Sequence, residues 1–574
     1  MAGIFTPARA ARLRPPNIWD AVALLCVVGA LVAVANAARG TLVPLSAPQA
    51  TEISLDPAYL PGYALRTTLR MFAALAASLA FTFTYAPLAA KSRRAGLVMV
   101  PMLDILQSVP ILGFLGFTIA FFMNLFPGQV MGLELAAIFA IFTSQAWNMA
   151  FSFHQSLSTV PGDLDEATRS FRLTGWQRFW RLEVPYAMPG LVWNTMLSMS
   201  GGWFFVVASE AITLGDQSWT LPGVGSYVAL ALQRQDIVAV GWAVLTMLVV
   251  ILIYDQLLFR PLVAWSARFR VETTPSAEAP DPWVLALLRR TRVLRLGGEA
   301  LGRGLATIGG LRLALPPVAP ALRRVPPVLG DAVFAVLVFG VVGGALWKIT
   351  VYVSAALSWT DVALTLGLGA ITLLRVMVMI VLASLIWVPV GVWLGLRPAW
   401  ARRVQPVAQF LAAFPANLLF PPVVLVIVHY GLDADVWLTP LMVLGTQWYI
   451  LFNVIAGASA FPGDLQEVAR HFHIGGWLWW RRVIMPGILP YYLTGAITAS
   501  GGSWNAAIVA EVASWGDKKL VAHGLGAYIA QATGAGDFHR IVLGVVVMSL
   551  FVVGLNRLFW RPLAAHTARR ATLS

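Results

Sequence analysis

The chain has 574 residues, of which 59% are hydrophobic and only 11% are charged. A soluble domain carries about 25% charged residues, and the mean hydropathy here is +0.75, so the composition excludes an ordinary soluble globule and indicates an integral membrane protein. The net charge of +14 reflects arginines placed beside apolar runs, as the positive-inside bias predicts, and does not indicate a nucleic-acid partner. The single cysteine, Cys26, excludes a disulfide scaffold and a cysteine-based metal site.

Apolar runs predict six membrane-spanning helices in each half of the chain, since about 20 apolar residues cross the ~30 Å hydrocarbon core. In the first half the runs cover residues 20–38, 65–90, 97–123, 132–154, 190–212 and 237–259. In the second half they cover residues 332–353, 362–396, 404–430, 436–460, 487–513 and 541–559. The prediction is therefore an all-α polytopic membrane protein of about 12 transmembrane helices.

Two of these runs have a second interpretation. The tripeptide Ala35-Asn36-Ala37 also fits a signal-peptidase site, but the run before it is long for a signal peptide, so we expect a retained span. The run 362–396 is too long for one straight crossing, so we expect it to tilt or to begin outside the bilayer.

Basic residues predict the orientation of the chain. If the N-terminus is cytoplasmic, the basic clusters at 91–94, 397–403 and 561–570 are cytoplasmic too, whereas 518–519 and 539–540 fall outside. We expect both termini in the cytoplasm. With six spans in each half, both halves enter the membrane from the same side and form parallel repeats, related by an axis along the membrane normal.

Two polar loops between apolar runs carry the same residues 301 positions apart. The first loop runs from Pro161 to Pro189, and the second runs from Pro462 to Pro490. The identities include the pairs Glu166 and Glu467, Phe171 and Phe472, Trp176 and Trp477, and Arg181 and Arg482. So many matches in a charged loop indicate that another protein docks there.

The only long stretch without a span is a proline-rich linker at 265–330. Within it, 283–296 interleaves leucine and valine with four arginines. This pattern fits a helix lying on anionic lipid of the inner leaflet, or alternatively a regulatory or partner-binding segment. The predicted segments are 1–64 (first span and outer loop), 65–264 (first repeat), 265–330 (linker), 331–361 (seventh span and outer loop), 362–563 (second repeat) and 564–574 (tail).

Both loops resemble the cytoplasmic loop of integral-membrane permeases of binding-protein-dependent ABC importers. That loop carries Glu-Ala-Ala, then a glycine, then a proline-containing end, and the matching positions here begin at Glu166-Ala167-Thr168 and Glu467-Val468-Ala469. Where the family has its glycine, this chain has Arg172 and His473. A position that accepts a side chain does not require left-handed backbone, so we expect a reshaped turn.

A second block is similar to the nitrate, sulfonate, taurine and bicarbonate group of these permeases. Glu210 precedes a Gly-x-Gly-x-Tyr stretch that ends at Tyr227, and Glu511 precedes another that ends at Tyr528. The resemblance covers about 65–262 and 366–563. It implies two permease units fused in one chain, in the inner membrane of a bacterium, that form the path for a small solute such as nitrate, sulfonate, bicarbonate or an organic acid.

The resemblance also implies partners. The chain lacks a Gly-x-x-x-x-Gly-Lys-Ser/Thr loop, so we expect no enzyme activity and no cofactor in this chain, with ATP and Mg²⁺ on two copies of a separate ABC ATPase. A periplasmic or lipid-anchored solute-binding protein and membrane lipid are the other expected partners. The ATPase-coupling candidates are Asp163, Asp165, Glu166, Ala167, Arg169, Gly175, Asp464, Glu467, Ala469, Arg470 and Gly476.

The translocation path is predicted along the spans that follow the two loops, because polar side chains within a bilayer face protein or a water-filled cavity. The candidates are Asn194, Ser198, Ser200, Trp203, Glu210, Thr498, Ser503, Trp504, Asn505 and Glu511. The serines and threonines could equally join helices to each other. Glu210 and Glu511 fit either a gate or a structural pair near the outer surface, and Arg70 and Arg375 either add positive charge or snorkel. The histidines show no metal-ligand spacing.

Two other classes of protein remain as alternatives. Twelve spans arranged as six plus six also describe a secondary transporter driven by an ion gradient, although such a carrier has no need of two matched docking loops. A membrane-embedded enzyme or scaffold is disfavoured, because the sequence offers no triad, carboxylate dyad or metal cluster.

Overall fold

The computed structural model describes residues 53–109, 111–214, 217–269, 291–312, 327–459, 461, 463–515 and 518–571, with a few positions between 20 and 35. Most of the predicted first span at 20–38 and most of the basic segment at 283–296 lie outside the described residues. The chain divides into two compact units, each described by itself below. One unit comprises 1–39, 160–189 and 256–316, and the other comprises 40–159, 190–255 and 317–574.

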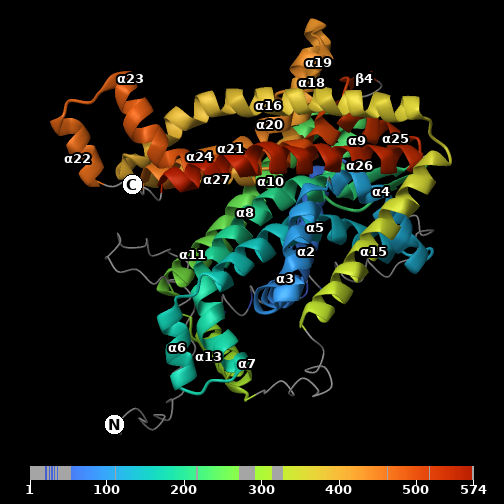
Figure 1. Cartoon of the computed structure of the whole chain (residues 1–574). Helices are drawn as coiled ribbons and strands as arrows, with labels where there is room; N and C mark the ends of the chain where they lie inside the picture. The colour runs from blue at the N-terminus through green and yellow to red at the C-terminus, as the bar shows by residue number, and fades with distance from the viewer. Residues whose placement is uncertain are drawn as a thin grey trace. The chain divides into compact units, whose positions relative to one another are not determined.

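The larger unit contains the apolar helices of both repeats (Figure 1). From the first repeat these are η3 (Pro57–Tyr59), α2 (Leu60–Lys91), α3 (Arg93–Ser108), α4 (Ile111–Leu125), α5 (Val130–Ser158), most of α8 (Val184–Glu210), α9 (Val224–Gln233) and α10 (Ile237–Tyr254). Helix α2 packs along α5, and α4 covers another part of α5. Small buried residues such as Ala74, Ala136 and Ala140 line these contacts and permit close helix approach.

The second repeat contributes the remaining helices of the larger unit. They are α15 (Pro327–Ser354), α16 (Trp359–Gly395), α17 (Pro398–Ala413), η7 (Ala416–Leu419), α18 (Phe420–Tyr430), α19 (Ala434–Trp437), α20 (Leu441–Leu444), α21 (Gln447–Ser459), α22 (Gly463–His471), α23 (Gly476–Trp479), η8 (Trp480–Ile484), α24 (Met485–Ala510), α25 (Leu525–Gly534), α26 (Phe538–Leu555), η9 (Asn556–Trp560) and α27 (Arg561–Ala571). Helix α21 packs between α16 and α24. The α16 helix has 37 residues, about 55 Å at 1.5 Å per residue, which exceeds the thickness of the hydrocarbon core.

The smaller unit holds the first repeated loop and most of the linker. Its described elements are α6 (Gly162–Ser170), α7 (Gly175–Arg178), η4 (Phe179–Glu183), η5 (Asp255–Phe259, which begins at the boundary), α11 (Arg260–Ser266), η6 (Ala267–Phe269) and α13 (Arg292–Gly310). The elements η4, η5, η8 and η9 are π-helical turns. Elements η4 and η8 begin 301 residues apart, and so do η5 and η9. The repeat therefore extends to local helix geometry.

Eight described helices are long and apolar enough to cross a membrane, or ten if two bent helix pairs each count as one span. The chain is thus a multi-pass membrane protein, with fewer continuous spans in the described residues than the twelve predicted. The expected crossing at 97–123 is two helices, α3 and α4, and the crossing at 404–430 is bent by 86°. Val109 and Phe414, at the two breaks, have extended ψ angles of 127° and 131°. Both precede a proline, which disfavours helical backbone.

Two short β-hairpins follow α8 and α24 and were not predicted. Strand β1 (Ala211–Leu214) pairs antiparallel with β2 (Gln217–Thr220), and β3 (Val512–Trp515) pairs with β4 (Lys518–Val521). The predicted spans 190–212 and 487–513 therefore end a few residues early, at Glu210 and Ala510. The hairpins return the chain to the helix ends, where Leu221 N donates to Glu210 O at 2.8 Å.

Candidate functional site: two loops and a cavity

Each repeated loop folds as two short helices joined by a tight turn. In the first loop α6 carries Asp163 and Asp165 in its first turn, where a carboxylate interacts favourably with the helix dipole. A capping box starts α7: Gln177 N donates to Thr174 Oγ1 and Thr174 N donates to Gln177 Oε1. Helices α22 and α23 form the equivalent pair in the second loop.

The turn after α6 and α22 corrects one prediction. Arg172 and His473 have φ angles of 50° and 53°, so both positions keep the left-handed geometry expected of the family's glycine. Two hydrogen bonds close each turn, from Arg172 N to Arg169 O and Leu173 N to Thr168 O, and likewise at 473 and 474. This is the Schellman pattern. The turn was not reshaped, because these bonds hold a side-chain-bearing residue in a conformation that costs about 1–2 kcal/mol.

The matched glutamates Glu166 and Glu467 are exposed on these helices, as are Asp163, Ala167 and Arg169. In the second loop Arg470 and Gly476 are exposed and Ala469 is buried, while the side chain of Asp464 lies outside the described residues. Gly175 is exposed in the first loop. The structure thus places the repeated carboxylates where a partner protein can reach them.

A chain of ion pairs joins the helices of the first loop. Asp165 is half-buried, with its Oδ1 atom 2.6 Å from Arg178 Nη1 and its Oδ2 atom 2.9 Å from Arg169 Nη2. Arg178 also pairs with Glu183, with its Nε atom 3.1 Å from Glu183 Oε1. The corresponding residues of the second loop are Gln466, Trp479 and Ile484, which cannot form these ion pairs.

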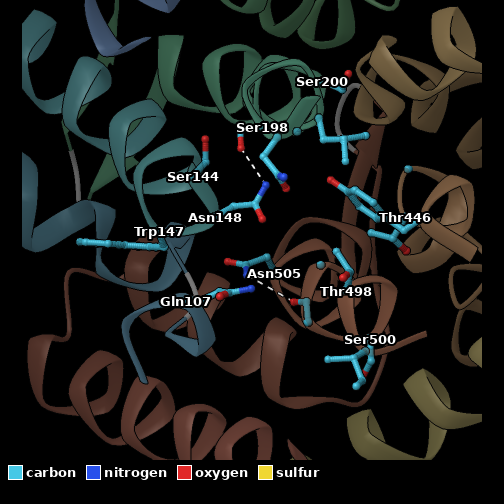
Figure 2. A pocket seen from close by; sticks show the side chains of 18 of the residues that line it. Gln107, Ser144, Trp147, Asn148, Ser198, Ser200, Thr446, Thr498, Ser500 and Asn505 are labelled. Atoms are coloured by element: carbon cyan, nitrogen blue, oxygen red, sulfur yellow. Dashed lines mark hydrogen bonds between the residues drawn. The ribbon is translucent and has the colours of Figure 1, made fainter. Parts of the chain in front are cut away.

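A cavity of about 730 Å³ lies between helices of the two repeats in the larger unit (Figure 2). Its walls come mainly from α5 and α8 on one side and from α21 and α24 on the other. The cavity wall is mostly apolar, with amide and hydroxyl groups among the apolar side chains: of the described residues that line it, none is Asp or Glu and one, Arg561, is a cation. The other polar groups of the wall are mainly amides and hydroxyls, and several aromatic rings also line it.

Hydrogen bonds hold several of the cavity side chains in place. Asn148 Nδ2 donates to Ser198 Oγ at 2.9 Å, and Asn194 Nδ2 donates to Ser152 Oγ at 2.8 Å. Asn505 Oδ1 accepts from Ile111 N at 2.7 Å, so α24 of the second repeat caps α4 of the first. In Figure 2 Asn148, Ser198 and Asn505 converge on the open space.

The cavity brings together half of the predicted path residues. Asn194, Ser198, Ser200, Thr498 and Asn505 line it. The other five lie elsewhere in the described structure: Trp203, Glu210, Ser503, Trp504 and Glu511 are buried against protein. A helix has only one face toward a cavity. Trp203 packs on Tyr254 and Trp504 on Phe551, and Ser503 shares a hydrogen bond with Thr446.

Sequence reasoning missed the contribution of α5 to the cavity. Ser144, Asn148, Ser152 and Gln155 follow one another at helical spacing and all line the wall. Polar residues at i, i+4 steps in an apolar helix mark a protein-facing or water-facing stripe. This signal was present in the sequence.

The two glutamates near the ends of α8 and α24 each lie in a buried ionic cluster. Glu210 Oε1 accepts from Thr67 Oγ1 and Arg70 Nη1, both at 2.7 Å, and Glu210 Oε2 accepts from Gly225 N at 2.6 Å. Arg70 also donates twice to Glu134, at 2.6 and 2.7 Å. Arg70 is only 3% exposed, so it does not snorkel.

The second cluster repeats the first with looser geometry. Glu511 accepts from Thr372 Oγ1 at 2.8 Å and Ala527 N at 2.9 Å, while Arg375 Nη1 lies 3.5 Å away. Arg375 bonds to Asp435 at 2.6 Å. Gly223 and Gly524 explain the first glycine of the Gly-x-Gly stretches, because a Cβ there would overlap the carboxylates of Glu210 and Glu511.

Comparison with known proteins identifies this fold. The family model described as "Binding-protein-dependent transport system inner membrane component" matches residues 59–260 and 387–561, more than half of the chain. The chain belongs to this family. The two matches confirm that two permease units are joined in one polypeptide, and the family resemblance predicted from the loops is confirmed.

Relatives fall among transport permeases of different solutes. The chain is 30% identical over 176 residues to the bicarbonate transport system permease protein CmpB of Synechococcus elongatus, covering 31% of this chain and 60% of that protein. It is 26% identical over 201 residues to the nitrate import permease protein NrtB of Leptolyngbya laminosa, covering 35% and 68%. The glycine betaine/carnitine transport permease protein GbuB of Listeria monocytogenes is 30% identical over 173 residues, covering 29% and 54%. The matches thus span about three fifths of the length of these relatives.

Proposed function

We propose that this chain is the permease subunit that forms the translocation path of an ATP-driven importer for a small anion, coupled to its ATPase through both repeated loops. The observation that carries the proposal is the duplicated loop: exposed Glu166 and Glu467 occupy equivalent places on α6 and α22, each followed by the same left-handed turn. A short helix fixed to its neighbouring span converts movement of a docked protein into movement of that span. A carrier driven by an ion gradient does not need two loops on which an ATPase docks.

The chemistry of the cavity supports an anion as the solute. Amide and hydroxyl donors line a space without acidic side chains among its described residues, and Arg561 adds one positive charge. Such donors stabilise an oxyanion and leave no carboxylate to repel it. Nitrate, bicarbonate, a sulfonate and an organic acid all fit this description, and two relatives carry bicarbonate and nitrate in their names.

The proposal includes partners and an orientation. Two copies of an ABC ATPase, which bind ATP and Mg²⁺, would each receive one loop, and a periplasmic or lipid-anchored binding protein would deliver the solute. Both loops and both termini would face the cytoplasm of a bacterium. The positive-inside distribution of arginine supports this orientation.

Uptake into proteoliposomes tests the proposal against the secondary-transporter alternative. The chain is reconstituted with the ATPase that co-purifies with it, and labelled bicarbonate, nitrate, taurine and glycine betaine are offered with ionophores that collapse every ion gradient. We expect uptake of an anion that needs ATP and survives the ionophores. Uptake driven by an imposed gradient without ATP would contradict the proposal, and ATP-dependent uptake of betaine alone would overturn its anion part.

A further inference from the structure

Helix α13, in the middle of the linker, packs against the first repeated loop within the smaller unit of the structure. Trp176 Nε1 donates to Ile308 O at 2.7 Å, and Gln177 Nε2 donates to Gly310 O at 2.9 Å. Gly309 lies so close to Trp180 of η4 that a Cβ built on it would be 3.0 Å from Trp180 Cβ. The last turn of α13 therefore sits directly on α7 and η4 (Figure 1).

These contacts satisfy groups that a helix end leaves free. The last carbonyls of a helix lack their regular partner within the helix. Here Gly310 O accepts from Gln177, and Ile308 O accepts from Trp176 as well as from Leu311 N. Gln177 serves both helices at once, because its Oε1 atom accepts from Thr174 N and caps α7 while its Nε2 atom caps α13. Gln177 is only 6% exposed. The start of α7 and the end of α13 are thus fixed by one side chain.

The second loop keeps the tryptophan of this contact as Trp477 but lacks the glutamine. Gly475 and Leu478 stand where the first loop has Thr174 and Gln177, and leucine can donate no hydrogen bond. Leu478 is 52% exposed and Trp477 is 79% exposed. The ion pairs of Asp165 with Arg178 also have no counterpart there. Among the described residues, the face that α13 covers in the first loop is exposed in the second.

We propose that α13 stays bound to the first repeated loop and stiffens it, so that the two repeated loops respond unequally to the ATPase subunits docked on them. We call this contact the brace. The first loop moves as one body with the linker, whereas the second moves without it. This inference rests on the proposed function, since it assumes that both loops transmit force. It makes the linker a point at which one of two otherwise equivalent ATPase sites is controlled from within the chain.

Hydrogen–deuterium exchange on the full chain tests the brace itself. Gln177→Leu copies the second loop, and Gly309→Val pushes against Trp180 from the linker side. Each lost hydrogen bond should raise the opening of the last turn of α13 about fivefold, with faster exchange in α7 as well. Gly304→Val is the matched control, because nothing lies within 4 Å of a Cβ at that position, and it should leave α7 unchanged. Equal exchange in α7 for wild type, Gln177→Leu and Gly309→Val would overturn the brace.

Transport by single-loop variants tests its consequence. A braced loop keeps its position better when its glutamate is lost, so Glu467→Lys should reduce ATP-driven uptake more than Glu166→Lys does. Gln177→Leu should remove most of that difference. Equal losses in both single variants, unaffected by Gln177→Leu, would overturn the inference while leaving the proposed function intact. Full uptake by the variant with both glutamates replaced would instead defeat the proposed function.

Discussion

Glu210 and Arg70 form a buried ion pair whose Oε1 and Nη1 atoms lie 2.7 Å apart, and Glu511 and Arg375 repeat it at 3.5 Å. Arg70 also pairs with Glu134, so one arginine contacts two buried carboxylates. Breaking a buried pair leaves an uncompensated charge and costs about 3–5 kcal/mol. The cluster therefore fixes the end of α8 to α2 and α5 in the first repeat.

Arg70→Met should destabilise the protein strongly, because it leaves Glu134 and Glu210 facing each other without a cation. Arg375→Met should cost less, since Asp435 is partly exposed and solvent compensates its charge. Thermal unfolding in detergent measures both, with Arg66→Met, a half-buried arginine on the same helix, as the control. An unfolding temperature for Arg70→Met equal to that of the control would contradict this account of the cluster.

Arg172→Gly should stabilise the first loop. Glycine adopts the left-handed region without the steric cost that a Cβ brings, a gain of about 1 kcal/mol. His473→Gly should gain less, because His473 Nδ1 also lies 3.0 Å from Arg470 O and that contact would be lost. Hydrogen exchange of the turn amides reports the local change. Faster exchange of Leu173 in Arg172→Gly would show that the arginine side chain, and not the backbone, holds this turn.

Asn505→Asp and Asn505→Ala together separate the structural role of this residue from its place in the cavity. Aspartate keeps the acceptor for Ile111 N, but it places a charge on a side chain that is only 8% exposed, so the unfolding temperature should fall. The new negative charge faces the cavity and should reduce uptake of an anion at least tenfold. Asn505→Ala removes the acceptor and adds no charge, so it should lose about 1–2 kcal/mol of stability and have a milder effect on uptake. Unchanged anion uptake by Asn505→Asp would remove this cavity from the transport path.

Cysteine labelling tests the proposed orientation. In a Cys26→Ser background, Glu166→Cys and Glu467→Cys should react with a membrane-impermeant maleimide only when it is supplied on the cytoplasmic side. His523→Cys should react from the opposite side, since its side chain is 78% exposed and the predicted topology places it outside. Labelling of both loops from the periplasm would reverse the topology.

Much of the architecture could be predicted from the sequence. Hydropathy gave the membrane class, and the 301-residue spacing of Glu166 and Glu467 gave the duplication. The broken helices were missed because each predicted apolar run continues through Val109 or Phe414. Only the proline after each residue marks the break. Similarly, polar side chains lie on several sides of α8, so their pattern did not separate the cavity face of Asn194 and Ser198 from the buried face of Trp203.

The ionic clusters were harder to predict, for a different reason. Arg70, Glu134 and Glu210 come from three helices and lie far apart in the sequence, so no local pattern joins them. The prediction of a reshaped turn at Arg172 is wrong because a side chain does not exclude left-handed backbone. In the structure the Schellman hydrogen bonds from Arg172 N and Leu173 N close the turn with an arginine in that position.

The central claim is that both exposed loops transmit the work of an ATPase to the path between the repeats. The variant Glu166→Lys with Glu467→Lys tests it most directly, by ATP-driven anion uptake in proteoliposomes that contain the co-purified ATPase. We expect a folded protein, with the unfolding temperature of the wild type, whose ATP-dependent uptake is lost. Uptake at the wild-type rate by this double variant would contradict the account.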